Sequence, residues 1–254
     1  TTVICADKTG TLTENKMSVT EVYLNGYIHV ANINKDLHLN TEAGYLLRAA
    51  VLCNDARLSH DGSFSGDPTE TALLVLAERA GLDVNAVLAQ FPRIASLPFS
   101  AERQCMQTLH LSSRAVSVRL MKGAPEVVLP LCGLGDELTA TVSEMAARGL
   151  RVLALAECTT PDHELGERAR DILEPELGAR AWTLLGLVGM IDPPRASAQS
   201  AISLCQQAGI KVKMITGDHP LTAAAIACQL GLLEPSGAVL SGKDIAACQG
   251  DELQ

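Results

Sequence analysis

Aromatic residues and long apolar runs are scarce in this sequence. Phe, Tyr and Trp together make up 3% of the 254 residues. The longest apolar run, at 184–191, is far shorter than the roughly 20 residues that a membrane-spanning helix needs. No signal-peptide pattern opens the printed sequence. We therefore expect the segment itself to be soluble.

Metal-binding cysteine pairs and an excess of positive charge are also missing. None of the eight cysteines stands in a C-x-x-C pair, so a zinc site is not indicated. Lys and Arg number 20 against 29 Asp and Glu, which gives a formal net charge of −9. Because nucleic-acid affinity comes mainly from Lys and Arg on phosphates, we expect no nucleic-acid partner. Hydrophobic residues, at 47%, suffice for a packed core.

The two ends of the chain have the pattern of an α/β fold. Residues 3–6 are apolar, typical of a buried strand in a parallel sheet, and they lead into a polar loop. Near the other end, predicted strands at 184–191 and 210–215 alternate with helices that end at Ala208 and Leu230. This alternation predicts part of a doubly wound parallel sheet.

The middle of the chain has a different pattern. Asn25-Gly26 separates two extended runs and predicts a hairpin, because both residues tolerate positive φ. Further predicted strands lie at 104–111, 115–122 and 150–156, and predicted helices at 42–52, 68–80, 137–148 and 162–180. We therefore expect residues 21–186 to form an α+β domain built on an antiparallel sheet. It would be inserted into an α/β domain made of residues 1–20 and 187–254.

Asp7 is the first candidate catalytic residue. Ligands of an open parallel sheet bind beyond the carboxyl ends of its strands, which is where Asp7 falls. A carboxylate there can attack a phosphorus atom, and the threonines and Gly10 that follow offer N–H and hydroxyl groups to a phosphate. Position alone leaves an alternative in which Asp7 is an ordinary turn or N-cap residue.

The string CADKTGTLTENKM, which contains Asp7, closely resembles the phosphorylation signature of P-type ATPases in the haloacid dehalogenase superfamily. The resemblance implies that Asp7 becomes a phospho-aspartate beside Lys8. It also implies that Asp7 and the Thr9 carbonyl help to hold Mg²⁺. Ala6 replaces the usual Ser, a change between small residues that we expect to matter little.

Thr9 bears on a rival hypothesis, a soluble phosphatase of the same superfamily. Such phosphatases carry a second Asp two residues after the nucleophile as general acid–base, and here that position is Thr. Without this group, attack of water on an acyl phosphate is slowed. A pump needs that delay while it changes conformation. A non-catalytic nucleotide-binding module is the second rival, and the intact Asp7 argues against it.

The middle domain resembles the nucleotide-binding domain of type II cation pumps. The matching segments are GDPTETAL at 66–73, LPFS at 97–100, KGAPE at 122–126 and GLRVLA at 149–154. The resemblance implies that Phe99 stacks on adenine and that Lys122 lines the pocket. It implies that Glu70 lies near the base or binds pocket side chains, and that Arg151 reaches toward the phosphates.

Each of these residues also has a structural alternative. Glu70 follows Asp67 at the spacing of a helix capping box. Phe99, taken alone, is an ordinary core residue, and Lys122 and Arg151 are ordinary surface charges. Their occurrence together, in the order of the family, favours the functional interpretation.

Gly123 and Arg103 complete the expected nucleotide site. Gly123 belongs to the KGAPE motif, and Arg103 follows Phe99 at short distance. Gln104 departs from the family, since a pocket Lys is usual there. Losing one charge-assisted contact costs about 1.5–3 kcal/mol. We therefore predict weaker nucleotide binding than in a typical relative unless Arg103 compensates.

The second part of the predicted α/β domain, at 187–254, carries two further motifs of type II pumps. They are MIDPPR at 190–195 and MITGDHP at 214–220. The resemblance implies that Thr216 and Gly217 bind a phosphoryl group. Asp218 and Asp192 would position the nucleotide or its metal, or support the domain hinge. Asp218 has an alternative as the cap of the helix that begins near Pro220.

Taken together, the resemblance predicts an ATP-binding and phosphorylation segment of a cation-transporting P-type ATPase with ATP as substrate and Mg²⁺ as cofactor. Its partners would be an actuator domain and membrane helices that bind the transported cation, with Ca²⁺ as the first expectation. The segment would lie at the cytoplasmic face of a membrane. We expect a G-D-G-x-N-D loop beyond Gln254, and little or no turnover by the segment alone.

Overall fold

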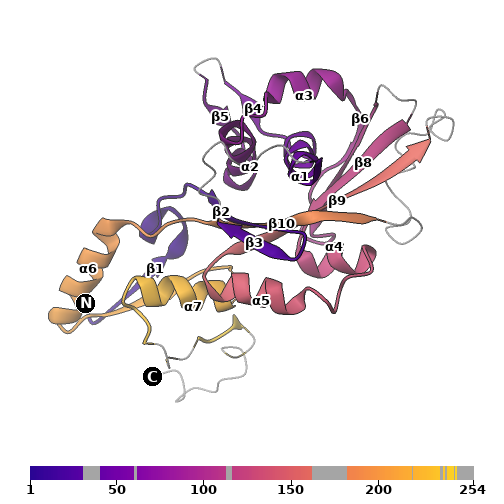
Figure 1. Ribbon diagram of the computed structural model, residues 1–254. Helices are drawn as coiled ribbons and strands as arrows, with labels where there is room; N and C mark the ends of the chain where they lie inside the picture. The colour runs from indigo at the N-terminus through magenta and orange to yellow at the C-terminus, as the bar shows by residue number, and fades with distance from the viewer. Residues whose placement is uncertain are drawn as a thin grey trace. The chain divides into compact units, whose positions relative to one another are not determined.

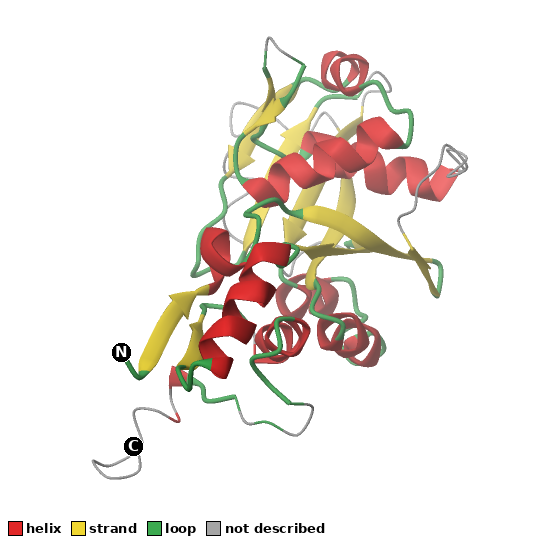
Figure 2. Ribbon diagram, turned by 90° about the vertical axis from the view of Figure 1, so that its left-hand side faces the viewer, coloured by secondary structure: helices red, strands yellow, loops and turns green. Residues whose placement is uncertain are grey.

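A computed structural model of the chain describes residues 1–30, 41–59, 62–112, 116–161, 182–218, 220–234, 237, 239–242 and 244. These residues form two compact units (Figure 1). Unit 1 comprises residues 1–16, 143–151 and 191–254, and unit 2 comprises residues 17–142 and 152–190. Both units mix helices and strands, which confirms the mixed α/β class expected from the sequence (Figure 2).

Unit 2 is built on a seven-stranded sheet with the order β3-β2-β10-β9-β8-β7-β6. Its strands are β2 (Ser18–Leu24), β3 (Tyr27–Val30), β6 (Arg93–Leu97), β7 (Cys105–His110), β8 (Val116–Gly123), β9 (Arg151–Pro161) and β10 (Thr183–Ile191). The ladders that join β2 to β3, β6 to β7, β7 to β8 and β8 to β9 are antiparallel. The predicted hairpin is confirmed, with Asn25 and Gly26 both at positive φ.

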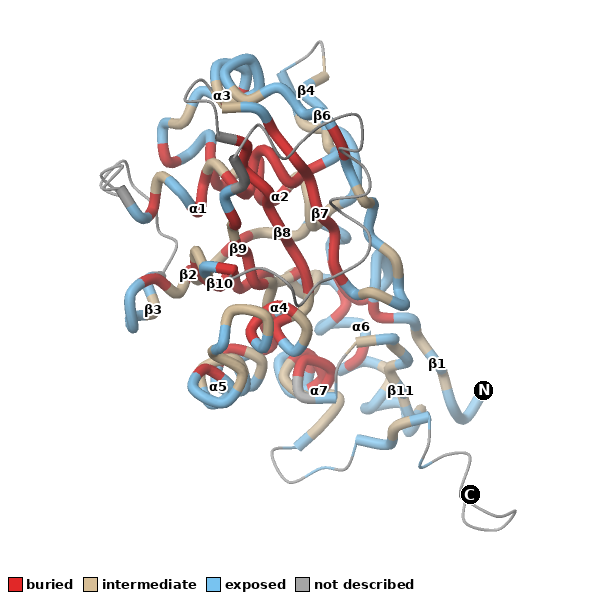
Figure 3. The backbone as a smooth tube through the Cα atoms, turned by 90° about the vertical axis from the view of Figure 1, so that its right-hand side faces the viewer, coloured by how far each residue is buried: buried red, intermediate tan, exposed pale blue. Residues whose placement is uncertain are grey.

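Helices cover both faces of this sheet (Figure 1). They are α1 (Thr41–Leu52), α2 (Pro68–Arg79) and α3 (Val84–Gln90) on one face and α4 (Pro125–Leu131) on the other. The two-stranded ribbon of β4 (Arg57–Leu58) and β5 (Phe64–Ser65) lies between α1 and α2 in sequence. Leu120 and Leu155 of the sheet pack with Leu46, Leu47 and Leu73 of the helices. Strands β7 and β8 are buried almost throughout (Figure 3), so the core of unit 2 lies along them.

Unit 1 contains a two-stranded parallel sheet of β1 (Val3–Asp7) and β11 (Lys211–Ile215). Its helices include α6 (Ala196–Gln207) and α7 (Pro220–Gln229), and α5 (Thr139–Ala147) is divided between the residue ranges of the two units. An irregular turn, η1 (Lys8–Leu12), follows β1. Ile202 of α6 and Ile226 of α7 bury their side chains with Leu12 in a small core.

Two expectations about the strands need correction. The strand at 184–191 was expected to belong to the parallel sheet, but β10 lies between β2 and β9 in the large sheet. Residues 3–6 do form a strand, yet β1 and β11 alternate between exposed and half-buried residues. In a two-stranded sheet a strand has few neighbours to cover it, whereas β10 has a partner on each side. The helix predicted at 162–180 lies outside the described residues.

Candidate functional sites

Asp7 lies at the carboxyl edge of the parallel sheet of unit 1. In the register of β1 with β11, Asp7 is opposite Ile215, the last residue of β11. Thr216, Gly217 and Asp218 follow directly, so both predicted catalytic segments leave the sheet at the same edge. Parallel pairing makes this convergence necessary, because the carboxyl ends of parallel strands meet at one edge.

The turn after Asp7 is held by polar contacts. The Thr9 N–H donates to Asp7 Oδ1 at 3.3 Å, and Gly10 takes a φ of 74° that a residue with a side chain rarely adopts. Lys8 is 7% exposed, and its Nζ lies 2.6 Å from Asp218 Oδ2. The structure therefore brings Asp7, Lys8 and Asp218 together. The Asp218 carboxylate binds Lys8, and its N–H donates to Thr216 Oγ1 at 3.1 Å.

Asp192 is 6% exposed and fastens the returning chain to the same turn. Its Oδ2 accepts from Thr13 Oγ1 at 2.5 Å, and its Oδ1 accepts from the Lys16 N–H at 3.1 Å. Arg195, which the sequence did not single out, donates to the carbonyls of Thr13 at 2.7 Å and Gly10 at 3.1 Å. These contacts hold Asp192 against the chain that follows the Asp7 turn. Its expected role, toward the nucleotide, its metal or the domain hinge, stays a prediction.

The nucleotide-site candidates of unit 2 gather at one end of its sheet. The register places the start of β7 beside the end of β8, with Cys105 opposite Gly123 and Met106 opposite Lys122. Phe99 stands between β6 and β7 and is 59% exposed, so it is not a core residue. An exposed aromatic ring at a sheet end has a free face for a base. Arg151, the first residue of β9, is exposed and falls within unit 1.

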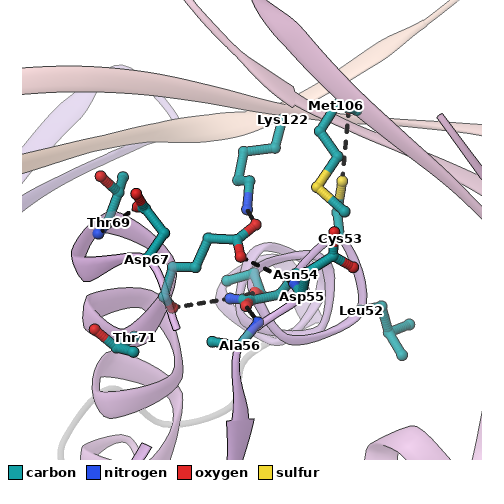
Figure 4. A network of polar contacts seen from close by, with 12 residues as sticks. Leu52, Cys53, Asn54, Asp55, Ala56, Asp67, Thr69, Thr71, Met106 and Lys122 are labelled. Carbon is teal, nitrogen blue, oxygen red and sulfur yellow. Dashed lines mark hydrogen bonds and ion pairs between the residues drawn. The ribbon is translucent and has the colours of Figure 1, made fainter. Parts of the chain in front are cut away.

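Glu70 and Lys122 form a partly buried ion pair. Lys122 shares a face of β8 with the buried Leu120, and its Nζ lies 2.8 Å from Glu70 Oε1. Glu70 Oε2 accepts from the Asp55 N–H at 3.1 Å, so the carboxylate does not close the capping box expected with Asp67. Asp67 itself caps α2 by accepting from the Thr69 N–H at 2.8 Å. Figure 4 shows Lys122 reaching from the sheet toward the turn that holds Asp55.

The remaining residues of this site shape the backbone. A Cβ added at Gly123 would meet the Cβ of Cys105 at 2.6 Å and the Gln104 carbonyl oxygen at 2.7 Å, so only glycine fits there. Gln104 takes a φ of 53°, and its carbonyl accepts from the Ala124 N–H at 3.0 Å. Arg103 donates through Nη2 to the Pro98 carbonyl at 2.9 Å, which holds its guanidinium against the turn that carries Phe99.

Sequence reasoning missed the residues that support Glu70, namely Asn54, Asp55 and Arg93. Nothing in their local pattern marks them, because their contacts join segments up to 41 residues apart. Burial beside this network raises the pKa of the Cys53 thiol, whose Sγ donates to the Met106 carbonyl at 3.6 Å. Cys53 is therefore a neutral core residue at ordinary pH.

Neither a metal cluster nor a membrane-spanning helix is found in the described part of the chain. No group of three or more His, Cys, Asp and Glu side chains there converges as a set of metal ligands. The exposed Asp7 carboxylate and the Thr9 carbonyl are nevertheless hard oxygen donors of the kind that Mg²⁺ prefers. Among the same residues, no helix combines the length and the apolar character needed to cross a bilayer.

Comparison with known proteins gives a consistent result. The family model for "P-type ATPase, cytoplasmic domain N" matches residues 43–134 and 132–197. The chain is 41% identical to a probable cation-transporting ATPase F of Mycobacterium tuberculosis, over 99% of this chain and 31% of that protein. It is 37% identical to calcium-transporting ATPase 1 of Lactococcus lactis, over 100% of this chain and 29% of the relative.

A eukaryotic relative extends the comparison. The sodium/potassium-transporting ATPase subunit alpha-1 of Oreochromis mossambicus is 35% identical, over 97% of this chain and 27% of that subunit. The chain thus spans less than a third of the length of these relatives. The resemblance to type II pumps inferred from the motifs is confirmed, and the chain belongs to the P-type ATPase family, of which it includes cytoplasmic domain N.

Proposed function

We propose that this chain is the ATP-binding and phosphorylation segment of a cation-transporting ATPase that forms an aspartyl phosphate on Asp7. The observation that carries the proposal is the convergence of Asp7 with Thr216, Gly217 and Asp218 at one edge of the parallel sheet. Relatives named as cation- and calcium-transporting ATPases support a transported cation, with Ca²⁺ as the first candidate. The complete protein would then sit in a membrane, with this segment on the cytoplasmic face.

In the proposed reaction, an Asp7 carboxylate oxygen attacks the γ-phosphorus of ATP. A bond forms between that oxygen and phosphorus, the bond from phosphorus to the β-phosphate oxygen breaks, and ADP leaves. Water later cleaves the acyl phosphate to regenerate the carboxylate and release inorganic phosphate. Lys8, Thr216 and Gly217 supply an ammonium, a hydroxyl and a backbone N–H to the transferred group. Mg²⁺ bound by Asp7 and the Thr9 carbonyl would offset negative charge on the phosphates.

In the nucleotide site, Phe99 would stack on the adenine ring through its exposed face. The Glu70–Lys122 pair would line the pocket beside it, with Gly123 and Arg103 shaping the backbone around it. Arg151 would approach the phosphates. Such a mixture of one apolar face and a few fixed polar groups is typical of small-molecule sites.

Phosphorylation of the full-length protein by γ-labelled ATP tests the proposal. We expect an acid-stable, hydroxylamine-sensitive phosphoprotein that disappears in Asp7→Asn, because an amide is not a nucleophile for phosphorus. Loss of label in Asp7→Asn with retained ATP binding would match the proposal. Label that persists in Asp7→Asn would overturn it. Fast hydrolysis of small phosphate esters by the isolated chain would favour a soluble phosphatase instead.

A further inference from the structure

The turn that follows α1 determines how the Glu70 carboxylate is oriented. One carboxylate oxygen accepts from the Asp55 N–H at 3.1 Å, and the other lies 2.8 Å from Lys122 Nζ. The Lys122 side chain is 8% exposed and the Glu70 side chain 16%. A charged pair this far from water depends on its hydrogen bonds for its geometry. The position of the Lys122 ammonium therefore depends on the backbone at Asp55.

The side chain of Asn54 holds this turn in place through three hydrogen bonds. Its Nδ2 donates to the Ala50 carbonyl of α1 at 3.0 Å and to the Glu70 carbonyl of α2 at 2.9 Å. Its Oδ1 accepts from the Ala56 N–H at 2.9 Å. Asn54 is 5% exposed, and its bond to the Ala50 carbonyl is buried. One side chain thus ties together two helices and the turn between them (Figure 4).

Arg93, on β6 of the sheet, binds the same turn. Its Nη1 lies 2.5 Å from Asp55 Oδ1, and its Nη2 donates to the Leu52 carbonyl at 2.9 Å and to the Asn54 carbonyl. The guanidinium therefore caps the carboxyl end of α1 and holds Asp55 in place. Arg93 begins β6, and β6 ends two residues before Phe99. Strand β6 therefore connects Arg93 to the exposed Phe99 ring.

We propose that Asn54 and Arg93 are positioning residues of the nucleotide site. They hold the Asp55 N–H where it orients Glu70, and Glu70 in turn holds the Lys122 ammonium at the pocket. The inference rests on the proposed nucleotide-binding function. Neither residue belongs to the motifs that predicted that function, and their effect on the nucleotide passes through the Glu70 carboxylate.

A double-mutant cycle on the 254-residue chain tests this inference. ATP affinity is measured by calorimetry for the wild type, Asn54→Ala, Arg93→Gln, Glu70→Ala and the two double variants that contain Glu70→Ala. We expect Asn54→Ala and Arg93→Gln each to weaken ATP binding about fivefold in the wild-type background. In the Glu70→Ala background the same changes should have almost no effect, because the group that they position is gone.

Arg48→Gln is the matched control. Arg48 makes a part-buried ion pair with Glu157 at 3.1 Å, between α1 and the same sheet, but it does not contact the Asp55 turn in the described structure. We expect Arg48→Gln to lower the thermal unfolding temperature while ATP affinity stays within about twofold of the wild type. A loss of affinity equal to that of Asn54→Ala would mean that general destabilisation explains both, and the inference would be wrong.

The remaining outcomes also decide for or against the positioning role. Unchanged ATP affinity in the single variants, or an equal loss in both backgrounds, would overturn it. No ATP binding by the wild-type chain would instead count against the proposed function. If Asn54→Ala fails to fold, Arg93→Gln alone decides between the two outcomes, because the Arg93 side chain is 29% exposed whereas Asn54 is buried.

Discussion

The two candidate sites are held in place by different means. In unit 2, Lys122 projects from a seven-stranded sheet whose central strands are buried, and its partner Glu70 comes from a helix packed in the same core. In unit 1, Asp7 and Asp218 stand at the edge of a two-stranded sheet whose strands are only partly buried. There the polar contacts of Asp192 and Arg195 hold the turn that follows Asp7.

This difference indicates where each site is vulnerable. A site mounted on a large apolar core tolerates the loss of a surface contact but responds to changes within the core. A site on a small sheet with a small core depends more on individual buried hydrogen bonds, each of which is costly to leave unmade. Substitutions in the two units can test this contrast, and they are taken in order of decreasing expected effect.

Asp192→Ala should have the largest effect, and it should be confined to unit 1. The change removes two hydrogen bonds to the buried Asp192 carboxylate, those from the Thr13 hydroxyl and the Lys16 N–H. Hydrogen bonds to charged groups contribute roughly 1.5–3 kcal/mol each, so local opening of unit 1 should become easier by about 4 kcal/mol. Hydrogen exchange resolved by residue measures this.

Glu144→Ala is the control for Asp192→Ala within unit 1. Glu144 makes an exposed ion pair with Arg148, so its loss should change stability by about 0.5 kcal/mol or less. Faster exchange in α1 and α2 of unit 2 as well as in unit 1 after Asp192→Ala would contradict the separate support of the two sites.

Unit 2 should lose stability in acid through His110. The ring is fully buried on β7, and burial lowers the His110 pKa from its ordinary value to about 4, although its Nδ1 lies 2.9 Å from the Phe91 carbonyl. Below pH 6.5 the unfolded chain binds a proton that the folded chain does not. The free energy of unfolding should therefore fall as pH drops from about 6.5 to about 4, by about 3 kcal/mol in total.

Denaturant unfolding of the wild type and His110→Gln across this pH range provides the measurement. The variant keeps a polar side chain but has no group that titrates there, so the contribution assigned to His110 should vanish. The same slope against pH in both proteins would show that another group causes the acid sensitivity.

Gly123→Ala should destabilise unit 2 and weaken nucleotide binding together. The new methyl group would lie 2.6 Å from the Cys105 Cβ and 2.7 Å from the Gln104 carbonyl oxygen, and neither atom belongs to the free end of a side chain. Overpacking of this kind costs about 1–3 kcal/mol. Gly81→Ala, just after α2, is the control. Its added Cβ has no atom within 4 Å, but Gly81 takes a φ of 84°, so this variant has backbone strain without crowding. Retained stability in Gly123→Ala would show that β7 and β8 can move apart.

Gln104→Gly should give the smallest change in stability, and both changes proposed at Gln104 are gains. Its φ of 53° is unfavourable for a residue with a side chain, so Gln104→Gly should stabilise unit 2 by about 1 kcal/mol or less. Gln104→Lys should instead tighten ATP binding, because a charge-assisted contact replaces a neutral one. Calorimetric titration of the wild type and Gln104→Lys measures this, and unchanged affinity would contradict the prediction.

Much of the local structure could be predicted from sequence, for reasons that are themselves local. The hairpin at Asn25-Gly26 and the capping of α2 by Asp67 follow from backbone preferences over a few residues. The placement of β10 could not be predicted in this way. An apolar run of its length suits the interior of either kind of sheet, and only its partners β2 and β9 decide between them.

For the candidate sites, too, the local sequence predicted the residues but not their long-range contacts. The motifs identified Asp7 and Lys122 as candidates and implied that Glu70 could bind a pocket side chain. They did not predict the pairing of Lys8 with Asp218 or the bond from the Asp55 N–H to Glu70. Glu70 stands at capping-box spacing, yet its carboxylate binds Lys122 and the Asp55 N–H, because a charge from β8 and a free backbone N–H lie within its reach. Whether such partners are near cannot be read from the local pattern, since Glu70 and Lys122 are 52 positions apart.

The sequence by itself determined the chemical groups of this protein and the order in which they occur, because each motif that supplied the candidate residues is a short contiguous string. The tertiary structure alone decided which groups meet: Lys8 with Asp218, Asp192 with Thr13, and Arg93 with the turn beside Glu70. These contacts arise from strand register and helix packing. Both are set by burial over the whole fold, which no short stretch of sequence contains.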